Sequence, residues 1–484
     1  MLKRFYSFRT RHQPYMVRHS YRHELRSALT YPLAASLAEG SFTGVVAAKY
    51  FHASPVLIAV ITAAPMFGNI MALAWAEMAR GRRKVPFVNL LQAGLVMTVA
   101  SAALTAFLPP RWGGWAFAAL IIMARLLASG IVTLRSEIWR ANYPRHVRGQ
   151  IIGRITVVAT AVLAGTTFLG SAWLDRDPRA FVWLYPMAAL LGALGIWQFS
   201  KIRVRREWQH LRRQQLYTPR PENLSQTDEA NVLNYMPGAL RGVRAFVSES
   251  MRVLREDRAF RTYQRWQFVS GASFMMLGPS LLYMVSKEMT DPRRDYLLAT
   301  VVLQIIPMAM SLAFTQVWAP LFDRVHITVF RVVQTSVSVA AMAILFGGAA
   351  ANSLWTIAAG QVLVGISNAG GNLAWNLGHN DFAPRGRDGT YMGVHVMLTG
   401  LRGCLAPFLG AWLYQVPWIG RGVFLISALL STTALVGFAI MARHAPPKVA
   451  AAPVYGRQKP STRPATGCCP PGDVKTPSST SARA

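Results

Sequence analysis

Cysteine and acidic residues are both scarce in this sequence. Three cysteines occur among the 484 residues, and two of them, Cys468 and Cys469, are adjacent near the end of the chain. This number and spacing exclude a disulfide framework and a cysteine metal site. The chain also lacks the sequence Gly-x-x-x-x-Gly-Lys-Ser/Thr, so it carries no phosphate-binding loop of that kind for an ATPase. We therefore expect no metal and no cofactor.

The shortage of acidic residues leaves the chain strongly basic. Aspartate and glutamate number 20 against 51 lysines and arginines, which gives a formal charge of +31. Such a charge can indicate a nucleic-acid-binding protein. Here, however, the basic residues are dispersed between apolar runs and do not gather in one soluble domain. This distribution is typical of membrane loops that face anionic lipid, and it argues against nucleic acid as a partner.

Apolar runs of roughly 20 residues recur along the chain, of which 52% is hydrophobic. A helix of about 20 apolar residues crosses a hydrocarbon core of about 30 Å. Irregular backbone cannot face lipid, so these runs should be helical. The sequence therefore predicts an all-α polytopic membrane protein with twelve transmembrane helices, embedded in a lipid bilayer. The predicted spans cover residues 27–48, 55–78, 85–108, 113–134, 149–173, 181–199, 263–286, 296–321, 327–348, 354–377, 390–413 and 423–441.

The basic residues also predict the orientation of the chain. With the N-terminus inside, 41 of the 51 lysines and arginines fall on the cytoplasmic side, if Arg154, Arg265 and Arg331 at the inner ends of spans are counted there; 8 fall outside and 2 lie deep within spans. Because positively charged loops stay in the cytoplasm, both termini are expected there. The basic start of the chain has no apolar region of its own, so it is not a cleavable secretory signal. We expect the plasma (inner) membrane of a bacterium.

The predicted spans divide the chain into five segments. These are a basic cytoplasmic tail (1–26), a first six-helix bundle (27–199), a cytoplasmic linker (200–262), a second six-helix bundle (263–443) and a disordered cytoplasmic tail (444–484). Within the linker, apolar residues recur every three or four positions among arginines. This pattern predicts an amphipathic helix over residues 238–257 on the inner membrane surface. Its apolar positions are Leu240, Val243, Val247, Met251 and Leu254.

The two predicted bundles repeat each other at a spacing of 240 residues. The first copy contains Pro144-Arg145, Gly149, Gly153 and Phe168-Leu169-Gly170, and the second contains Pro384-Arg385, Gly389, Gly393 and Phe408-Leu409-Gly410. Repeats of six spans are one construction used by secondary transporters. The duplicated bundle with its long basic linker resembles the major facilitator superfamily over residues 25–443.

Two loops carry part of a motif of that family. The loop after its second span usually reads Gly-x-x-x-Asp-Arg-x-Gly-Arg-Arg. This chain keeps Gly81-Arg82-Arg83 but has Met78 at the aspartate position, and the loop after span eight keeps Asp323-Arg324. Since the family uses this loop to hold its two conformations, the resemblance implies a gating role for Arg82, Arg83, Asp323 and Arg324. The alternative is that these charges only set the topology.

Three charged residues fall near the middle of predicted spans: Glu39, Arg125 and Arg402. An arginine or aspartate at a helix centre costs about 2.5–3.5 kcal/mol, and such residues normally mark a pathway. The family lines its cavity with spans one, four, seven and ten, so the resemblance implies that Glu39 and Arg125 face each other or the same water. Glu39 is the candidate protonation site. Ser36, Glu39 and Thr43 share one predicted helix face.

Spans ten and eleven add further polar side chains. Four asparagines stand four residues apart, and an amide without a partner in hydrocarbon is unfavourable. They are expected to face the cavity, where they would contact substrate, or a neighbouring helix, where they would hydrogen-bond across the packing seam. The asparagines are Asn368, Asn372, Asn376 and Asn380.

Arg402 shares a helix face with His395 and Thr399 and has no obvious acidic partner at its depth. A guanidinium suits carboxylate or phosphate through its planar fork of donors. Arg402 and His395 are therefore candidates for holding an anionic or zwitterionic group of the substrate. Alternatively, Arg402 caps a backbone carbonyl or lies in water beside a chloride ion.

Together these features predict a secondary active transporter that moves a small solute by alternating access, with energy from a proton or another ion. An enzyme is not expected, because no set of paired acids, metal ligands or nucleophile and base falls at one depth. The remaining alternative is a non-transporting membrane sensor or scaffold that shares the fold.

Overall fold

The computed structural model describes residues 15–79, 81–216, 238–384 and 387–444. Within these ranges every regular element is a helix, and no strand occurs. Nine helical segments of the described residues are long and apolar enough to cross a membrane. The all-α membrane architecture predicted from the apolar runs is therefore confirmed.

The first half of the chain and the linker supply nine α-helices. They are α2 (Tyr15–Ala35), α3 (Gly40–Lys49), α4 (Pro55–Met78), α5 (Lys84–Ala102), α6 (Pro110–Asn142), α7 (Arg145–Arg176), α8 (Phe181–Phe199), α9 (Glu207–Leu216) and α10 (Gly238–Glu256). The helix predicted from the amphipathic pattern in the linker is α10. The short helix α9 was not predicted.

The second half supplies the remaining α-helices. They are α11 (Arg258–Tyr283), α12 (Tyr296–Thr300), α13 (Ile306–Arg324), α14 (Ile327–Ala350), α15 (Leu354–Leu377), α16 (Asp388–Gln415) and α17 (Val423–Ala442). Two π-helical turns extend this set, Met284–Met289 after α11 and Val301–Ile305 between α12 and α13. Helices thus occupy all twelve predicted span ranges within the described residues.

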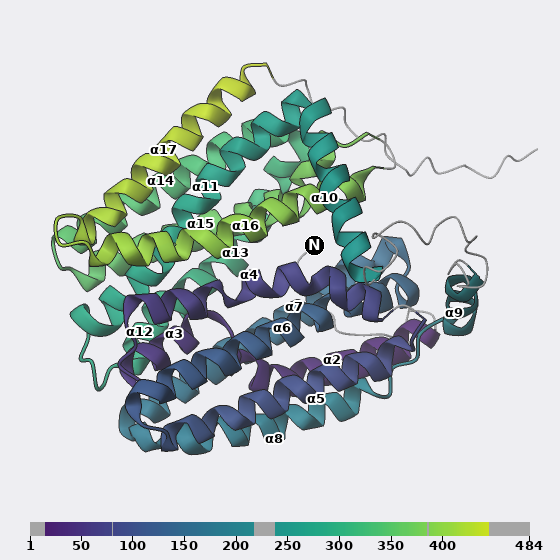
Figure 1. The fold of residues 1–484 in the computed structure, drawn as a ribbon, viewed down its shortest axis with the longest axis horizontal. Helices are drawn as coiled ribbons and strands as arrows, with labels where there is room; N and C mark the ends of the chain where they lie inside the picture. Colours follow the sequence, from purple (N-terminus) through teal and green to yellow (C-terminus); the bar gives the residue numbers. More distant parts are fainter. Residues whose placement is uncertain (1–14, 80, 217–237, 385–386, 445–484) are drawn as a thin grey trace, which may run out of the picture. The chain divides into compact units, whose positions relative to one another are not determined.

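Helix packing in the second half repeats that in the first. In the first half, α2 packs on α7 and α8, α6 packs on α4 and α5, and α5 packs on α8. In the second half, α11 packs on α16 and α17, α15 packs on α13 and α14, and α14 packs on α17. Figure 1 shows each set as a separate layer of helices, purple to blue for the first and teal to yellow for the second. The duplication seen in the sequence is therefore a duplication of the fold.

The first predicted span differs most from expectation. Its helix begins at Tyr15, within the stretch predicted as a tail, because Val17 and Tyr21 are buried there. The prediction of one continuous helix through residues 27–48 is also wrong. Glu39 is extended (φ −133°, ψ 151°) and Gly40 has φ +72°, a conformation that favours glycine. The backbone is therefore interrupted between α2 and α3.

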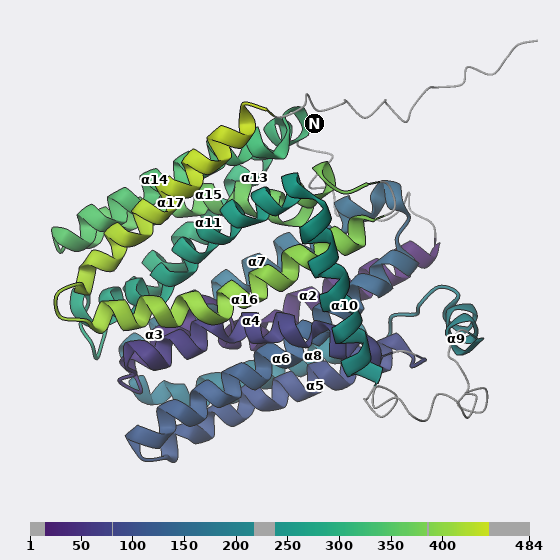
Figure 2. The same ribbon diagram turned by 45° about the horizontal axis from the view of Figure 1, so that its top comes forward.

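The two halves are joined near one end of the bundle. We call this the far end; it carries Lys49, Asp175 and the segment from Met284 to Tyr296. The opposite end, where α10 lies across α11 and α16, is called the linker end (Figure 2). Packing between the halves also involves α4 against α16 and α7 against α12.

Candidate functional site

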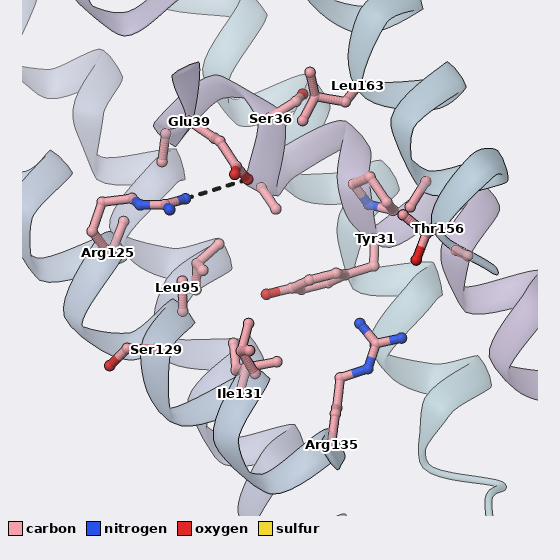
Figure 3. A pocket seen from close by; sticks show the side chains of 18 of the residues that line it. Tyr31, Ser36, Glu39, Leu95, Arg125, Ser129, Ile131, Arg135, Thr156 and Leu163 are labelled. Carbon is pink, nitrogen blue, oxygen red and sulfur yellow. Dashed lines mark ion pairs between the residues drawn. The ribbon is translucent and has the colours of Figure 1, made fainter. Parts of the chain in front are cut away.

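A polar pocket lies within the first half, among α2, α4, α6 and α7 (Figure 3). Its volume of about 490 Å³ falls in the range of about 300–1,000 Å³ that is usual for small-molecule sites. Alanine, leucine and isoleucine side chains form much of the wall. The polar side chains that line it are Ser27, Tyr31, Ser36, Glu39, Asn69, Arg125, Ser129, Thr133, Arg135, Thr156 and Thr160.

One end of the pocket holds the Glu39–Arg125 ion pair. Arg125 Nη1 lies 3.3 Å from Glu39 Oε2, and the two side chains are 18% and 44% exposed. Figure 3 shows the pair spanning the space between α6 and the interruption after α2. Thr43 lies beyond the interruption, is buried, and donates to the carbonyl of Gly40. The predicted stripe of Ser36, Glu39 and Thr43 is therefore not one face, because the helix does not continue through Glu39.

A residue of the second half stabilises this interruption. The backbone N–H of Phe42 donates to Gln304 Oε1 at 2.7 Å, and Gln304 Nε2 donates to Thr167 Oγ1 at 3.4 Å. Ser41 Oγ donates to the carbonyl of Leu303. Gln304 belongs to the π-helical turn Val301–Ile305, a feature that is frequent at functional sites. The segment that presents Glu39 is thus shaped by both halves.

The other end of the pocket contains Arg135 and Tyr31. Arg135 Nη2 donates to Glu24 Oε1 at 2.9 Å, and the Tyr143 hydroxyl donates to Glu24 Oε2 at 2.6 Å. Trp139 also donates to Glu24, which is 1% exposed. Figure 3 shows the Tyr31 ring between the Glu39–Arg125 pair and Arg135. The Tyr31 hydroxyl is buried and has no partner in the described part of the chain.

The far end is closed by polar contacts between the halves. The Asp175 carboxylate accepts from the backbone N–H groups of Tyr296 (2.5 Å) and Leu297 (3.0 Å) at the start of α12. A carboxylate there satisfies free N–H groups and complements the helix dipole. Lys49 Nζ, from α3, donates to Thr290 Oγ1 and to the carbonyls of Asp291 and Arg294. Separation of the halves at this end would break all of these bonds.

Arg402 and His395 lie outside the pocket, in the core of the second half. Arg402 is 5% exposed and donates from Nη1 to the carbonyl of Gln267 at 2.5 Å. His395 Nδ1 lies 3.2 Å from Gln264 Oε1, and its ring is 5.7 Å from that of Trp375. The backbone-carbonyl alternative for Arg402 is thus the arrangement present in this structure.

The asparagines of α15 also lie outside the pocket of the first half. Asn372 and Asn376 are exposed, Asn368 is partly buried, and Asn376 Nδ2 donates to the carbonyl of Asn372 at 2.7 Å. The latter bond is made within the helix. The asparagines lower the hydropathy of α15, which explains why this helix does not count among the nine apolar spans.

The residues predicted to act in gating lie at the linker end. Arg83 Nε is 3.5 Å from Glu207 Oε2, and the Arg82 guanidinium lies 5.6 Å from the centre of the Phe87 ring. Glu207 begins α9, so this loop is connected to the linker. Asp323 and Arg324 are exposed at the end of α13.

Several residues that shape the site were not predicted. Tyr31, Arg135 and Gln304 lie in or beside apolar runs and carried no motif. The sequence did offer one indication of the role of Glu24, because it is the only acidic residue among the basic first 26 residues. A single acid there, within reach of an arginine near the end of a span, could have indicated the Glu24–Arg135 pair.

The repeated bundles, the interrupted first helix and the polar pocket beside the interruption define a transporter fold. The model of the Major Facilitator Superfamily matches the chain over residues 29–407 and over residues 266–467. The chain therefore belongs to this superfamily.

Solved structures agree with this assignment. The nucleoside transporter NupG is 13% identical, with a TM-score of 0.60 over 88% of this chain and 99% of that chain. The xylose transporter XylE from E. coli, in a partially occluded inward-open conformation, is 10% identical, with a TM-score of 0.59 over 90% and 99%. A POT family transporter in complex with 5-aminolevulinic acid is 12% identical, with a TM-score of 0.59 over 88% and 96%. No curated protein sequence matches the chain.

Proposed function

We propose that this protein is a secondary active transporter that moves a small polar solute across the membrane by alternating access. The observation that carries the proposal is the pocket of about 490 Å³ at the interrupted first helix. Interrupted helices form the substrate and ion sites of many transporters. The solved neighbours transport nucleosides and xylose or bind 5-aminolevulinic acid, all of them small polar molecules.

The polar contacts at the far end support one half of an alternating-access cycle. Asp175 and Lys49 hold the halves together there, so in this conformation the solute would enter and leave the pocket at the linker end. Opening of the far end requires the Asp175 carboxylate to leave the N–H groups of Tyr296 and Leu297, which would then donate to water. The basic loops favour a cytoplasmic position for the linker end.

Glu39 is the proposed proton site. Its carboxylate is 44% exposed and faces Arg125, so water in the pocket can deliver a proton to it. Protonation would remove the ion pair and leave the Arg125 guanidinium free to bind solute. The link between the two events would couple solute movement to the proton gradient. A D-xylose–proton symporter is among the structural neighbours, with 12% identity and a TM-score of 0.61.

The charges of the pocket favour a neutral or zwitterionic solute. Arg125 is paired with Glu39 at 3.3 Å, and Arg135 is paired with Glu24 at 2.9 Å. While Glu39 is ionised, an anionic solute would have to compete with these carboxylates for both guanidinium groups. The role of Arg402 and His395 as an anionic anchor remains a separate prediction for the second half, and Asn368, Asn372 and Asn376 remain candidate contacts on its α15.

Reconstitution into liposomes tests the proposal. We expect an inward proton gradient to drive accumulation of one class of neutral or zwitterionic solute, such as sugars, nucleosides or short peptides. Glu39→Gln should abolish accumulation but retain exchange of solute at equal concentrations. Glu137→Gln is the matched control, because Glu137 pairs with Lys84 at 3.0 Å outside the pocket. Failure of every solute class to move would instead favour the non-transporting sensor.

A further inference from the structure

At the linker end, α10 crosses α11 and α16 (Figure 2). A second hollow is lined by residues of these three helices. It measures about 490 Å³ and is separate from the pocket of the first half. Its floor is apolar. The floor side chains are Met251 and Leu254 from α10, Phe268 and Val269 from α11, and Leu398 from α16.

Three arginines surround this apolar floor: Arg255, Arg261 and Arg265. Arg261 Nη1 donates to the carbonyls of Leu254 and Arg255, which holds the end of α10 against α11. Arg255 and Arg265 are exposed, and neither forms an ion pair with a carboxylate in the part of the chain that the structure describes. Two guanidinium groups are therefore available at the edge of an apolar groove.

Arg252, on the same helix, differs from these two arginines because it is paired with carboxylates. Its Nη2 lies 2.5 Å from Glu249 Oε2, and its Nε lies 4.0 Å from Glu256 Oε1. Glu249 also accepts from Arg387, which precedes α16. The acidic residues of α10 are thus engaged away from the groove, and the charge left at the groove is positive.

We propose that this groove binds one anionic phospholipid. An apolar floor with adjacent cations matches an amphiphile whose acyl chain packs on Phe268, Val269 and Leu398 while Arg255 and Arg265 bind its phosphate. Guanidinium binds phosphate well because its planar fork of donors fits two oxygens. A membrane lipid is the source that fits, because α11 and α16 are membrane-crossing helices. A free phosphate compound would leave the apolar floor without a partner.

The exposed surface of α10 supports the same occupant. Val247 and Met251 are 42% and 43% exposed although both are apolar. A basic amphipathic helix with such a face lies in the membrane interface, where anionic headgroups gather near lysine and arginine. The bound lipid would join α10 to the ends of α11 and α16. This inference does not depend on which solute the protein moves.

Native mass spectrometry of the full-length protein, released from nanodiscs of phosphatidylglycerol and phosphatidylcholine with identical acyl chains, tests the proposal. We expect one phosphatidylglycerol to be retained preferentially. The double variant R255Q/R265Q should reduce that preference about tenfold, since each interfacial arginine contributes to anionic-lipid attraction. R252Q, on the same helix but paired with glutamates, should keep it. R255K/R265K should retain part of the preference.

Three results of this retention comparison would overturn the proposal. They are equal retention of both lipids by the unmodified protein, an unchanged preference in R255Q/R265Q, and equal loss in R252Q. Glycerol 3-phosphate should not displace the lipid at millimolar concentration, and displacement would show that the groove recognises a soluble phosphate instead. Thermal unfolding in detergent checks folding of the variants; if the double variant is unfolded, R265Q alone replaces it in the same comparison.

Discussion

The backbone N–H of Phe42 in the first half donates to the side-chain oxygen of Gln304 in the second, at 2.7 Å across 262 positions of sequence. This bond lies where the first helix is interrupted, one turn from the carboxylate-bearing residue Glu39. It therefore connects closure of the far end to the segment that forms the pocket. A movement that separates the halves at this point would also release the backbone segment that contains Glu39.

Gln304→Ala should loosen both the interruption and the far end. The substitution leaves the buried N–H of Phe42 without a partner, which costs about 1–3 kcal/mol. We expect a lower midpoint of thermal unfolding and faster labelling of a cysteine placed at Ser41. Gln415→Ala is the control, because Gln415 bonds only to the carbonyl of Ala411 in its own helix among the described contacts. Equal labelling rates in the two variants would contradict the connection.

Gly40→Ala should destabilise the protein. Gly40 has φ +72°, which costs a residue with a side chain about 1–2 kcal/mol. An added Cβ would also lie 2.7 Å from Gln304 Oε1. Gly165→Ala in α7 is the matched control, since a Cβ there meets no atom within 4 Å. We expect Gly40→Ala to lower the unfolding midpoint and Gly165→Ala to preserve or raise it. A normal midpoint for Gly40→Ala would argue against the interruption.

Asp175→Ala should shift the conformational equilibrium toward opening of the far end. It removes the acceptor for the N–H groups of Tyr296 and Leu297, which belong to the other half. Cysteine accessibility at Thr300, whose hydroxyl meets Ser171 at 2.8 Å, would measure the shift. Asp177→Ala removes a carboxylate that binds the N–H of Arg179 within the same half, so it should not change this accessibility. An identical response of both variants would count against the capping role.

Acid should weaken the closed far end through His52. Partial burial, together with the positive charges of Lys287 and Arg293, lowers the pKa of His52 below its usual value of about 6.5. The unfolded or separated state then binds more protons, so closure is strongest above about pH 6.5 and weakens as the pH falls through the lowered pKa. His52 Nδ1 lies 2.8 Å from Lys287 Nζ, a contact that a protonated ring opposes.

Far-end cysteine labelling between about pH 7.5 and 5 measures this effect, since the window spans the usual histidine pKa. Because the thiolate is the reacting form, each rate is divided by that of a free thiol at the same pH. This normalised rate should rise toward acid in the unmodified protein and become less dependent on pH in His52→Asn. His444→Asn, an exposed histidine at the linker end, is the control and should keep the original profile. A profile unchanged by His52→Asn would remove His52 from the explanation.

Arg402→Gln distinguishes a substrate anchor from a structural arginine. An anchor predicts loss of transport with near-normal thermal stability, and Arg402→Lys would restore only part of it, because an ammonium cannot make the bidentate contact. A purely structural role predicts a lower unfolding midpoint, since the carbonyl of Gln267 loses its buried donor. Measuring uptake and unfolding on the same preparations separates the two results. Normal uptake by Arg402→Gln would leave Glu39 and Arg125 as the candidate coupling pair.

The sequence alone determined most of the helices, their duplication and the amphipathic α10. These depend on local runs and periodicities: about 20 apolar residues specify a crossing helix, and apolar residues every three or four positions specify one buried face. The depth of Glu39 and Arg125 followed from the same runs. Their approach to each other was expected only through the resemblance to a family.

Only the tertiary structure decided how the site is built. The interruption at Glu39 depends on the left-handed backbone of Gly40 and on Gln304, a residue 262 positions beyond Phe42, so no local pattern could reveal it. The same holds for Asp175, which caps a helix of the other half. From the sequence, Arg402 was interpreted as an unpaired charge. Its acceptor is the backbone carbonyl of Gln267, and because every residue has a backbone carbonyl, the sequence does not indicate this contact. Hydrophobic periodicity specifies which face of a helix is buried, whereas the partner of a polar group is set by the packing of distant helices.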